Sequence, residues 1–225
     1  MTSQLARLDV SVPIAIVQPL ISLSVVTGGV ATFSVESTGD PPPFEYEWRR
    51  TTNPRFTNRF FLNERRSFFT IPSAQTNHAG NYAVVVRGAS TQFGVNRTFS
   101  LTLLADGDLD GLPDIWEATY PLAGNPNQDT EDDGATNLEE YGAGTDPTDP
   151  NSVLRIQRLT VGSGATVEFL AMSNRTYAVQ YSDDLGGGGS ILADSLARTT
   201  NRTEIIVDPV ATSNRTYRLV TPRPQ

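Results

Sequence analysis

Two twelve-residue segments of this chain, loop one (106–117) and loop two (129–140), carry oxygen-bearing side chains at matching positions. Each has acids at positions 1, 3 and 5, glycine at 6, an acid or amide at 9 and glutamate at 12. Glycine at position 6 permits the sharp turn of a calcium loop, and Ca²⁺ prefers six to eight such oxygen ligands. Because the spacing occurs twice, it predicts two calcium sites and a chain centre folded around them.

The predicted ligands combine side-chain oxygens with the backbone carbonyl at position 7 of each loop. The glutamate at position 12 is expected to bind through both carboxylate oxygens, and position 9 directly or through water. In loop one the predicted ligands are Asp106, Asp108, Asp110, Leu112 through its carbonyl, Asp114 and Glu117. In loop two they are Asp129, Glu131, Asp133, Ala135 through its carbonyl, Asn137 and Glu140.

The formal net charge of −8 is concentrated in the same part of the chain. Residues 105–151 contain thirteen of the 25 acidic residues and no basic residue, whereas the remainder has 12 acids and 17 arginines. Acids this dense repel one another and resist compaction unless cations neutralise them. An acidic linker without metal is the alternative, but it would not need glycine at position 6 and glutamate at position 12 twice. The acidic total argues against nucleic acid as a partner.

Alternating apolar and polar residues flank this acidic centre. Runs such as 30–35 and 82–86 before it, and 166–169 and 177–181 after it, have the period of two that predicts β-sandwich strands. We therefore expect a mostly β chain with four parts. They are an N-terminal strand or extension (1–18), a sandwich (19–104), a calcium-binding connector (105–150) with one or two short helices at 113–119 and 136–141, and a second small β-sandwich (151–225).

The first β region resembles a bacterial immunoglobulin-like domain. Gly-Val-Ala-Thr-Phe-Ser-Val at 29–35 resembles strand B, and Phe-Glu-Tyr-Glu-Trp at 44–48 resembles strand C with Trp48 in the core. Ala-Gly-Asn-Tyr-Ala-Val at 79–84 resembles the tyrosine corner that precedes strand F. Val35 and Val84 stand where a disulfide-bonded member would carry cysteines, and His78 stands where the family usually has aspartate. The resemblance implies an immunoglobulin-like sandwich.

The connector resembles the bacterial thrombospondin type 3 calcium repeat and is similar to dockerin-type loops. The resemblance is carried by both loops and by Gly-Thr-Asp-Pro-Thr-Asp-Pro at 144–150. A strand-like run at 100–104 replaces the entering helix of an EF-hand. Pro113 at loop position 8 cannot donate the hydrogen bond that paired EF loops exchange. The resemblance implies Ca²⁺, two or more ions, as the cofactor, with Asp146 and Asp149 as further ligands.

The N-terminal residues permit two interpretations. The alternating run at 5–16 is either the first strand of the immunoglobulin-like domain with its lead-in, or a separate strand that belongs to a neighbouring domain. An unpaired apolar strand invites pairing with another chain. The second interpretation therefore predicts polymerisation by strand addition.

The sequence offers little for catalysis. It has no cysteine and a single histidine, His78, so the partners for a catalytic triad or a histidine metal site are missing. No Asp/Glu pair outside the loops stands out as a glycosidase pair. The stretch at 49–69 is rich in arginine and phenylalanine. It is either a hairpin with arginines on its solvent-exposed face and phenylalanines in the core, or a patch that binds an anionic glycan or an acidic protein surface. We therefore expect a non-enzyme.

These features favour a calcium-stabilised structural or adhesive protein, extracellular or at a bacterial cell surface. Its expected partners are other copies of itself or neighbouring surface domains, with glycan as an open alternative. No apolar stretch is long enough to span a membrane. The alternative function is a non-catalytic accessory region, glycan-binding or spacing, of a larger secreted enzyme. A glycosidase in its own right is the third and weakest interpretation.

Overall fold

The computed structural model describes residues 12–17, 20–39, 44–62, 65–88, 94–184, 189–212 and 214–222, with the backbone alone for 53–62. These residues form two compact units. The first comprises the described residues within 1–20, 35–68 and 81–99, and the second comprises those within 21–34, 69–80 and 100–225. The fold is mostly β, as the alternation predicted, and the described residues contain two α-helices.

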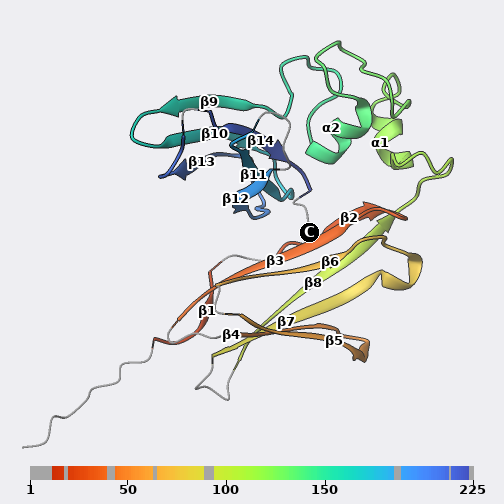
Figure 1. Ribbon diagram of the computed structural model, residues 1–225. Helices are drawn as coiled ribbons and strands as arrows, with labels where there is room; N and C mark the ends of the chain where they lie inside the picture. The colour runs from red at the N-terminus through yellow and green to blue at the C-terminus, as the bar shows by residue number, and fades with distance from the viewer. Residues whose placement is uncertain are drawn as a thin grey trace, which may run out of the picture. The chain divides into compact units, whose positions relative to one another are not determined.

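The immunoglobulin-like region is built from two sheets, one of three strands and one of five (Figure 1). The three-stranded sheet has the order β1 (Ala15–Ile16), β3 (Ala31–Thr38) and β6 (Arg66–Ile71). The five-stranded sheet has the order β2 (Leu23–Val26), β8 (Val95–Leu104), β7 (Gly80–Gly88), β4 (Phe44–Arg50) and β5 (Asn53–Leu62). β2 runs parallel to β8, and β4 is antiparallel to both of its neighbours.

Trp48 and Tyr82 lie in the core, as the resemblance implied. Both are fully buried, and both rings contact Phe99, at centroid distances of 5.8 and 5.7 Å respectively. The indole Nε1 of Trp48 donates a hydrogen bond to Ser67 Oγ at 3.0 Å, so this buried donor has a partner. His78 ends the 3₁₀ turn η1 (Thr76–His78), where its Nδ1 accepts from the Gln75 N–H at 2.9 Å.

The described part of the N-terminal segment pairs with its own chain. Ala15 lies opposite Thr38 and Ile16 opposite Ser37, so β1 joins β3 in the three-stranded sheet. This pairing favours the interpretation of these residues as the first strand of the immunoglobulin-like domain. Residues 5–11 of the predicted alternating run lie outside the described residues.

The C-terminal sandwich consists of two three-stranded sheets. One has the order β13 (Arg202–Asp208), β10 (Ala165–Ala171) and β9 (Ile156–Val161), and the other β12 (Ser190–Ser195), β11 (Tyr177–Ser182) and β14 (Thr216–Val220). Strand β10 shows why this sequence forms strands, because Val167, Phe169 and Ala171 are buried in alternation. They form a core with Tyr177 and Val179 of the other sheet. The second small β-sandwich predicted after residue 150 is therefore present.

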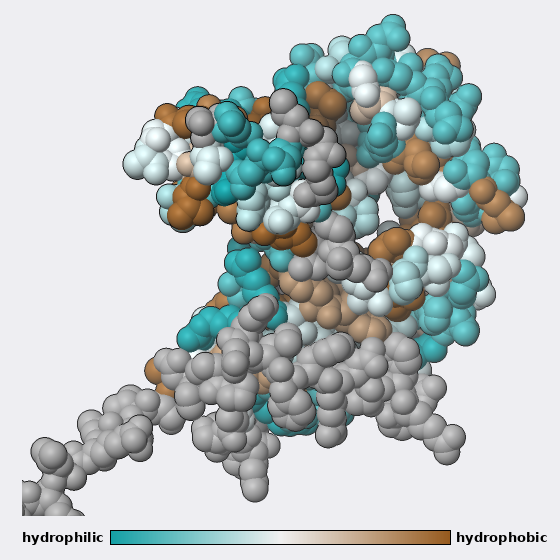
Figure 2. All heavy atoms as spheres, viewed as in Figure 1, coloured by the Kyte–Doolittle hydropathy of each residue, from teal (hydrophilic) through white to brown (hydrophobic). Residues whose placement is uncertain are grey.

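The connector carries both helices, α1 (Asp114–Thr119) and α2 (Asn137–Ala143). Helix α2 has a complete capping box, in which Thr136 Oγ1 accepts from the Glu139 N–H and Glu139 Oε2 accepts from the Thr136 N–H. It ends at Gly144, whose φ of 79° suits the left-handed C-terminal cap. In the described residues, neither helix has the length and apolarity that a bilayer crossing requires. Hydrophilic residues cover much of the connector's visible face (Figure 2).

Candidate metal centre

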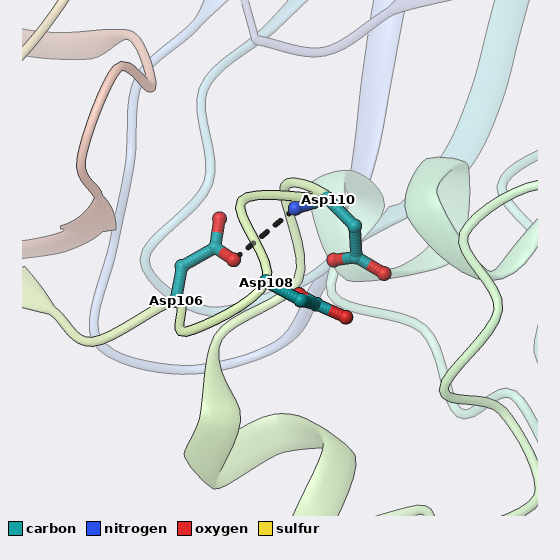
Figure 3. Close-up of side chains that lie close together, drawn as sticks. All are labelled: Asp106, Asp108 and Asp110. Carbon is teal, nitrogen blue, oxygen red and sulfur yellow. Dashed lines mark hydrogen bonds between the residues drawn. The ribbon is translucent and has the colours of Figure 1, made fainter.

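Loop one is closed by its own aspartates. Asp106 accepts two backbone hydrogen bonds, from the Asp110 N–H at Oδ1 (3.2 Å) and from the Gly111 N–H at Oδ2 (3.0 Å). Asp110 Oδ1 in turn accepts from the Leu112 N–H at 2.8 Å. These bonds turn the backbone around the side-chain oxygens of positions 1, 3 and 5, which Figure 3 shows gathered on one turn.

Loop two repeats this hydrogen-bond scheme position by position. Asp129 accepts from the Asp133 N–H at 3.1 Å and from the Gly134 N–H at 2.8 Å. Asp133 Oδ1 accepts from the Ala135 N–H at 2.8 Å. Two segments with different residues at most other positions thus adopt one local structure.

The backbone dihedrals of the two loops also correspond. Position 4 is left-handed in both, with φ of 62° at Leu109 and 60° at Asp132. Position 6 is the required glycine in both, with φ of 99° at Gly111 and 97° at Gly134. A side chain in this conformation costs about 1–2 kcal/mol, which explains why glycine occupies position 6.

The acids of each loop converge on one point. One carboxylate oxygen from each of Asp106, Asp108 and Asp110 lies within 4.8 Å of the others. The same holds for Asp129, Glu131 and Asp133 in loop two, which are all half-buried. Each group presents oxygens to a common centre, as hard cations require.

Glu117, the position-12 residue of loop one, lies in the field of that loop. Burial raises the pKa of its carboxyl, and the charges of Asp108, Asp110, Asp114 and Asp106 raise it further. A carboxylate whose main electrostatic neighbours are other carboxylates is poised for a cation rather than for an ion pair. The Glu117 carboxyl, at the end of loop one, is therefore influenced by the charges of the aspartates at its beginning.

Glu140, the position-12 residue of loop two, is fully buried, and neither of its carboxylate oxygens has a hydrogen-bond partner. Both oxygens of Glu131 and Oδ2 of Asp133 are buried and unpartnered as well. Burial first, and then Glu131 and Asp133, raises the pKa of Glu140 to about 8. Buried polar groups in proteins almost always have partners, and a buried carboxylate needs a donor or a cation. These residues therefore fit a divalent cation.

The residues at position 9 are engaged in other contacts. Asp114 Oδ1 accepts from the Gly107 N–H at 2.7 Å, which helps to close loop one. The buried amide of Asn137 accepts from Thr130 Oγ1 at 2.9 Å and donates to the Asn125 carbonyl at 2.8 Å. Both side chains hold their loops in shape, and direct ligation by either stays a prediction.

The trailing acids close turns of their own. Asp146 Oδ1 accepts from the Thr148 N–H and hydroxyl at 3.0 and 2.7 Å, and Asp149 Oδ1 accepts from the Asn151 N–H at 3.0 Å. Burial raises the pKa of Tyr120, and the charges of Asp146 and Glu140 add to the shift. Asp146 is half-buried, whereas Asp149 is exposed.

The arginine-rich stretch is only partly described, because the side chains of 53–62 lie outside the described residues. Two of its arginines make contacts within the immunoglobulin-like region. Arg65 donates to the Gly39 carbonyl at 2.9 Å and lies over the Phe44 ring, and Arg66 pairs with Glu36 at 3.3 Å. Together with the antiparallel pairing of β4 and β5, these contacts agree with the interpretation of the stretch as a hairpin of the domain.

Sequence reasoning overlooked two residues that contact the connector, Arg175 and Tyr177. They belong to the fragment Ser-Asn-Arg-Thr-Tyr, which occurs at 173–177 and again at 213–217. This repeat was the feature of the sequence that could have pointed to Arg175 and Tyr177. Each copy ends in a tyrosine whose hydroxyl is hydrogen-bonded in the structure.

Comparisons with known proteins bear on the first β region. The family model described as immunoglobulin domain matches residues 13–87, which supports an immunoglobulin-like domain there. A chimeric titin Z1Z2-Z1Z2 tandem is 26% identical over 42% of this chain and 51% of its own length, with a TM-score of 0.37. This chain therefore spans about half of that structure. Titin domain M7 is 24% identical over 43% of this chain and 99% of its own, also with a TM-score of 0.37. A search of curated proteins found no match.

Proposed function

We propose that this chain is a calcium-stabilised structural or adhesive module of an extracellular or cell-surface protein. The observation that carries the proposal is the group of buried carboxylate oxygens without hydrogen-bond partners, both of Glu131, both of Glu140 and Oδ2 of Asp133. Leaving such charges uncompensated costs several kcal/mol each, by the usual cost of burying an ion. A bound Ca²⁺ would supply the missing partner for all three.

Loop one supports the same role because its hydrogen bonds and dihedrals match those of loop two. In the proposal it holds a second ion through Asp106, Asp108, Asp110 and Glu117. Calcium sites of extracellular modules have dissociation constants of roughly 0.1–1 mM, and the medium keeps them filled. Such sites stiffen a structure rather than report a signal.

The helices favour a structural role over a sensing one. α1 has six residues and α2 has seven, whereas isolated helices shorter than about 12–15 residues are marginal in water. Calcium sensors work by opening a pair of longer helices between two stable arrangements. Here the ions would instead hold short helices in place.

An immunoglobulin-like domain is a structural or interaction module, and the proposal assigns no catalysis to the chain. The N-terminal strand does not enter the proposal, because Ala15 and Ile16 pair with β3 of the same chain and residues 5–11 lie outside the described residues. Polymerisation through that strand stays a prediction from the sequence. Binding of other copies, of neighbouring surface domains or of glycan stays a prediction from the sequence.

Limited proteolysis tests the structural role of calcium directly. The connector contains glutamates but no lysine or arginine, and the stretch without a tryptic site runs from 98 to 154. A glutamate-specific serine protease can therefore cut the connector, whereas trypsin cuts only the flanking regions. We expect at least a tenfold faster glutamate-specific cleavage at Glu117, Glu131 or Glu139 in chelator than in 5 mM Ca²⁺, since opening exposes the backbone.

Trypsin is the matched control, because its cleavage inside the immunoglobulin-like region should change much less. The fragments are identified by mass spectrometry, so that each cut is assigned to a residue. Equal rates of connector cleavage in calcium and in chelator would contradict the proposal.

A further inference from the structure

The end of helix α2 is held by the C-terminal sandwich. Arg175 Nη2 donates a hydrogen bond to the Tyr141 carbonyl at 2.9 Å, and the Tyr177 hydroxyl donates to the Ala143 carbonyl at 3.2 Å. The same hydroxyl accepts from the Met172 N–H at 2.9 Å. The last carbonyls of a helix lack partners within it. In α2 two of them are satisfied by residues of the sandwich.

This contact is buried and closely packed. Tyr177 is fully buried, and Ala143 is 4% exposed. The Arg175 guanidinium lies over the Tyr141 ring, 5.8 Å from its centroid. A Cβ added at Gly144 would lie 3.4 Å from Arg175 Nε, in ordinary van der Waals contact, so the arginine side chain lies directly beside the helix end. The contact therefore constrains α2 more than a surface hydrogen bond would.

The same helix supplies the position-12 ligand of loop two. Glu140 precedes Tyr141 directly and lies three residues before Ala143. The predicted calcium ligand and the two carbonyls that bond to the sandwich therefore share one helical turn. The turn is also closed at the C-terminal end of the helix, because the Gly144 and Thr145 N–H groups both donate to the Glu140 carbonyl, at 2.7 and 3.1 Å. A shift of this turn would move the Glu140 carboxylate and the carbonyls of Tyr141 and Ala143 together.

We propose that calcium in loop two and the C-terminal sandwich stabilise each other through α2, with Arg175 and Tyr177 as the positioning residues. This inference rests on the proposed function, because it requires that loop two binds the ion. Two sites that bias one element are coupled reciprocally. Calcium should therefore stabilise the sandwich, and loss of the Arg175 and Tyr177 contacts should weaken calcium binding.

The repeated fragment supplies a matched control. Tyr217 occupies the place of Tyr177 in the second copy, and its hydroxyl donates to Asp208 Oδ2 at 2.8 Å, inside the sandwich. Tyr177→Phe and Tyr217→Phe therefore remove the same atom from the same fragment. Only the first removes a hydrogen bond to α2.

The test is a calcium titration by calorimetry of the full chain carrying Glu117→Gln, which leaves loop two as the site observed. Adding Tyr177→Phe or Arg175→Met should weaken the remaining affinity by about threefold to tenfold, the usual size of one or two buried hydrogen bonds. Adding Tyr217→Phe should lower the melting temperature but leave that affinity unchanged. Affinities equal to that of the Glu117→Gln parent in both test variants would overturn the coupling while leaving the proposed function intact. A Glu117→Gln parent that binds no calcium would overturn both.

Hydrogen exchange provides a second readout if a variant fails to fold. Amides of β11 (177–182) should exchange at least threefold more slowly on calcium addition in Glu117→Gln, and show no such change in Glu140→Gln. Identical β11 exchange with and without calcium in Glu117→Gln, under conditions where the ion binds, would contradict the coupling.

Discussion

Removing calcium should lower the melting temperature of the chain by about 5–20 °C at pH 7.5. At 10 mM Ca²⁺, a site with a dissociation constant of roughly 0.1–1 mM adds about 1.4–2.7 kcal/mol to the free energy of unfolding. In the proposed function two such sites act together, and each 1 kcal/mol shifts the melting temperature of a chain of this size by about 2–4 °C. Differential scanning calorimetry in 10 mM Ca²⁺ and in chelator measures the shift.

Two controls make this measurement specific for the loops. The double variant Glu117→Gln, Glu140→Gln should melt at the same temperature in calcium and in chelator. Mg²⁺ should give a smaller shift than Ca²⁺, because it is smaller, demands octahedral geometry and gives up water reluctantly. A wild-type chain that melts at the same temperature in 10 mM Ca²⁺ and in chelator would contradict the account.

Glu140→Gln should make the metal-free chain more stable, although it removes a predicted ligand. In chelator the wild type must bury the Glu140 carboxyl beside Glu131 and Asp133, which at pH 7.5 requires the carboxyl to take up a proton. The substitution removes that cost while keeping the shape. We expect a gain on the order of 1–3 kcal/mol at pH 7.5, given 1.36 kcal/mol per unit of pKa shift. The same variant should lose the part of the calcium response that belongs to loop two. Chemical denaturation in chelator and in calcium measures both effects.

The pH dependence identifies the cause. The folded-state pKa of Glu140 is about 8, above its ordinary value of about 4.3. Between these values the metal-free native state binds more protons than the unfolded state. Its stability should therefore fall as the pH rises from about 5 to 8, and this fall should be much smaller in Glu140→Gln. Asp132→Asn, an exposed position of the same loop, should retain the wild-type profile. A Glu140→Gln profile as steep as that of the wild type would contradict this explanation.

The sequence was a good guide where structure follows from local rules. Apolar and polar residues alternate along 165–171 as the pleat of a strand requires. The alternation therefore predicted that Val167 and Phe169 share one buried face. The fixed spacing of the loops predicted which carboxylates converge, because glycine at position 6 and the aspartate at position 1 determine the turn locally.

The sequence was a poor guide where a contact joins distant residues. Arg175 meets Tyr141 across 34 positions, and nothing in the periodicity of either segment indicates that partner. Asn137 shows the same limit on a smaller scale. Its amide bonds to Thr130 and to the Asn125 carbonyl because the chain folds back there, and the loop spacing indicates neither of these partners. The deep burial of Glu140 likewise depends on the packing of the whole connector.

Equilibrium dialysis of the full chain against radioactive Ca²⁺ at 5 mM tests the central claim most directly. We predict at least two ions bound per chain, with one lost in Glu117→Gln, one lost in Glu140→Gln and both lost in the double variant. A folded wild-type chain that retains no calcium above the level of the double variant would contradict the account.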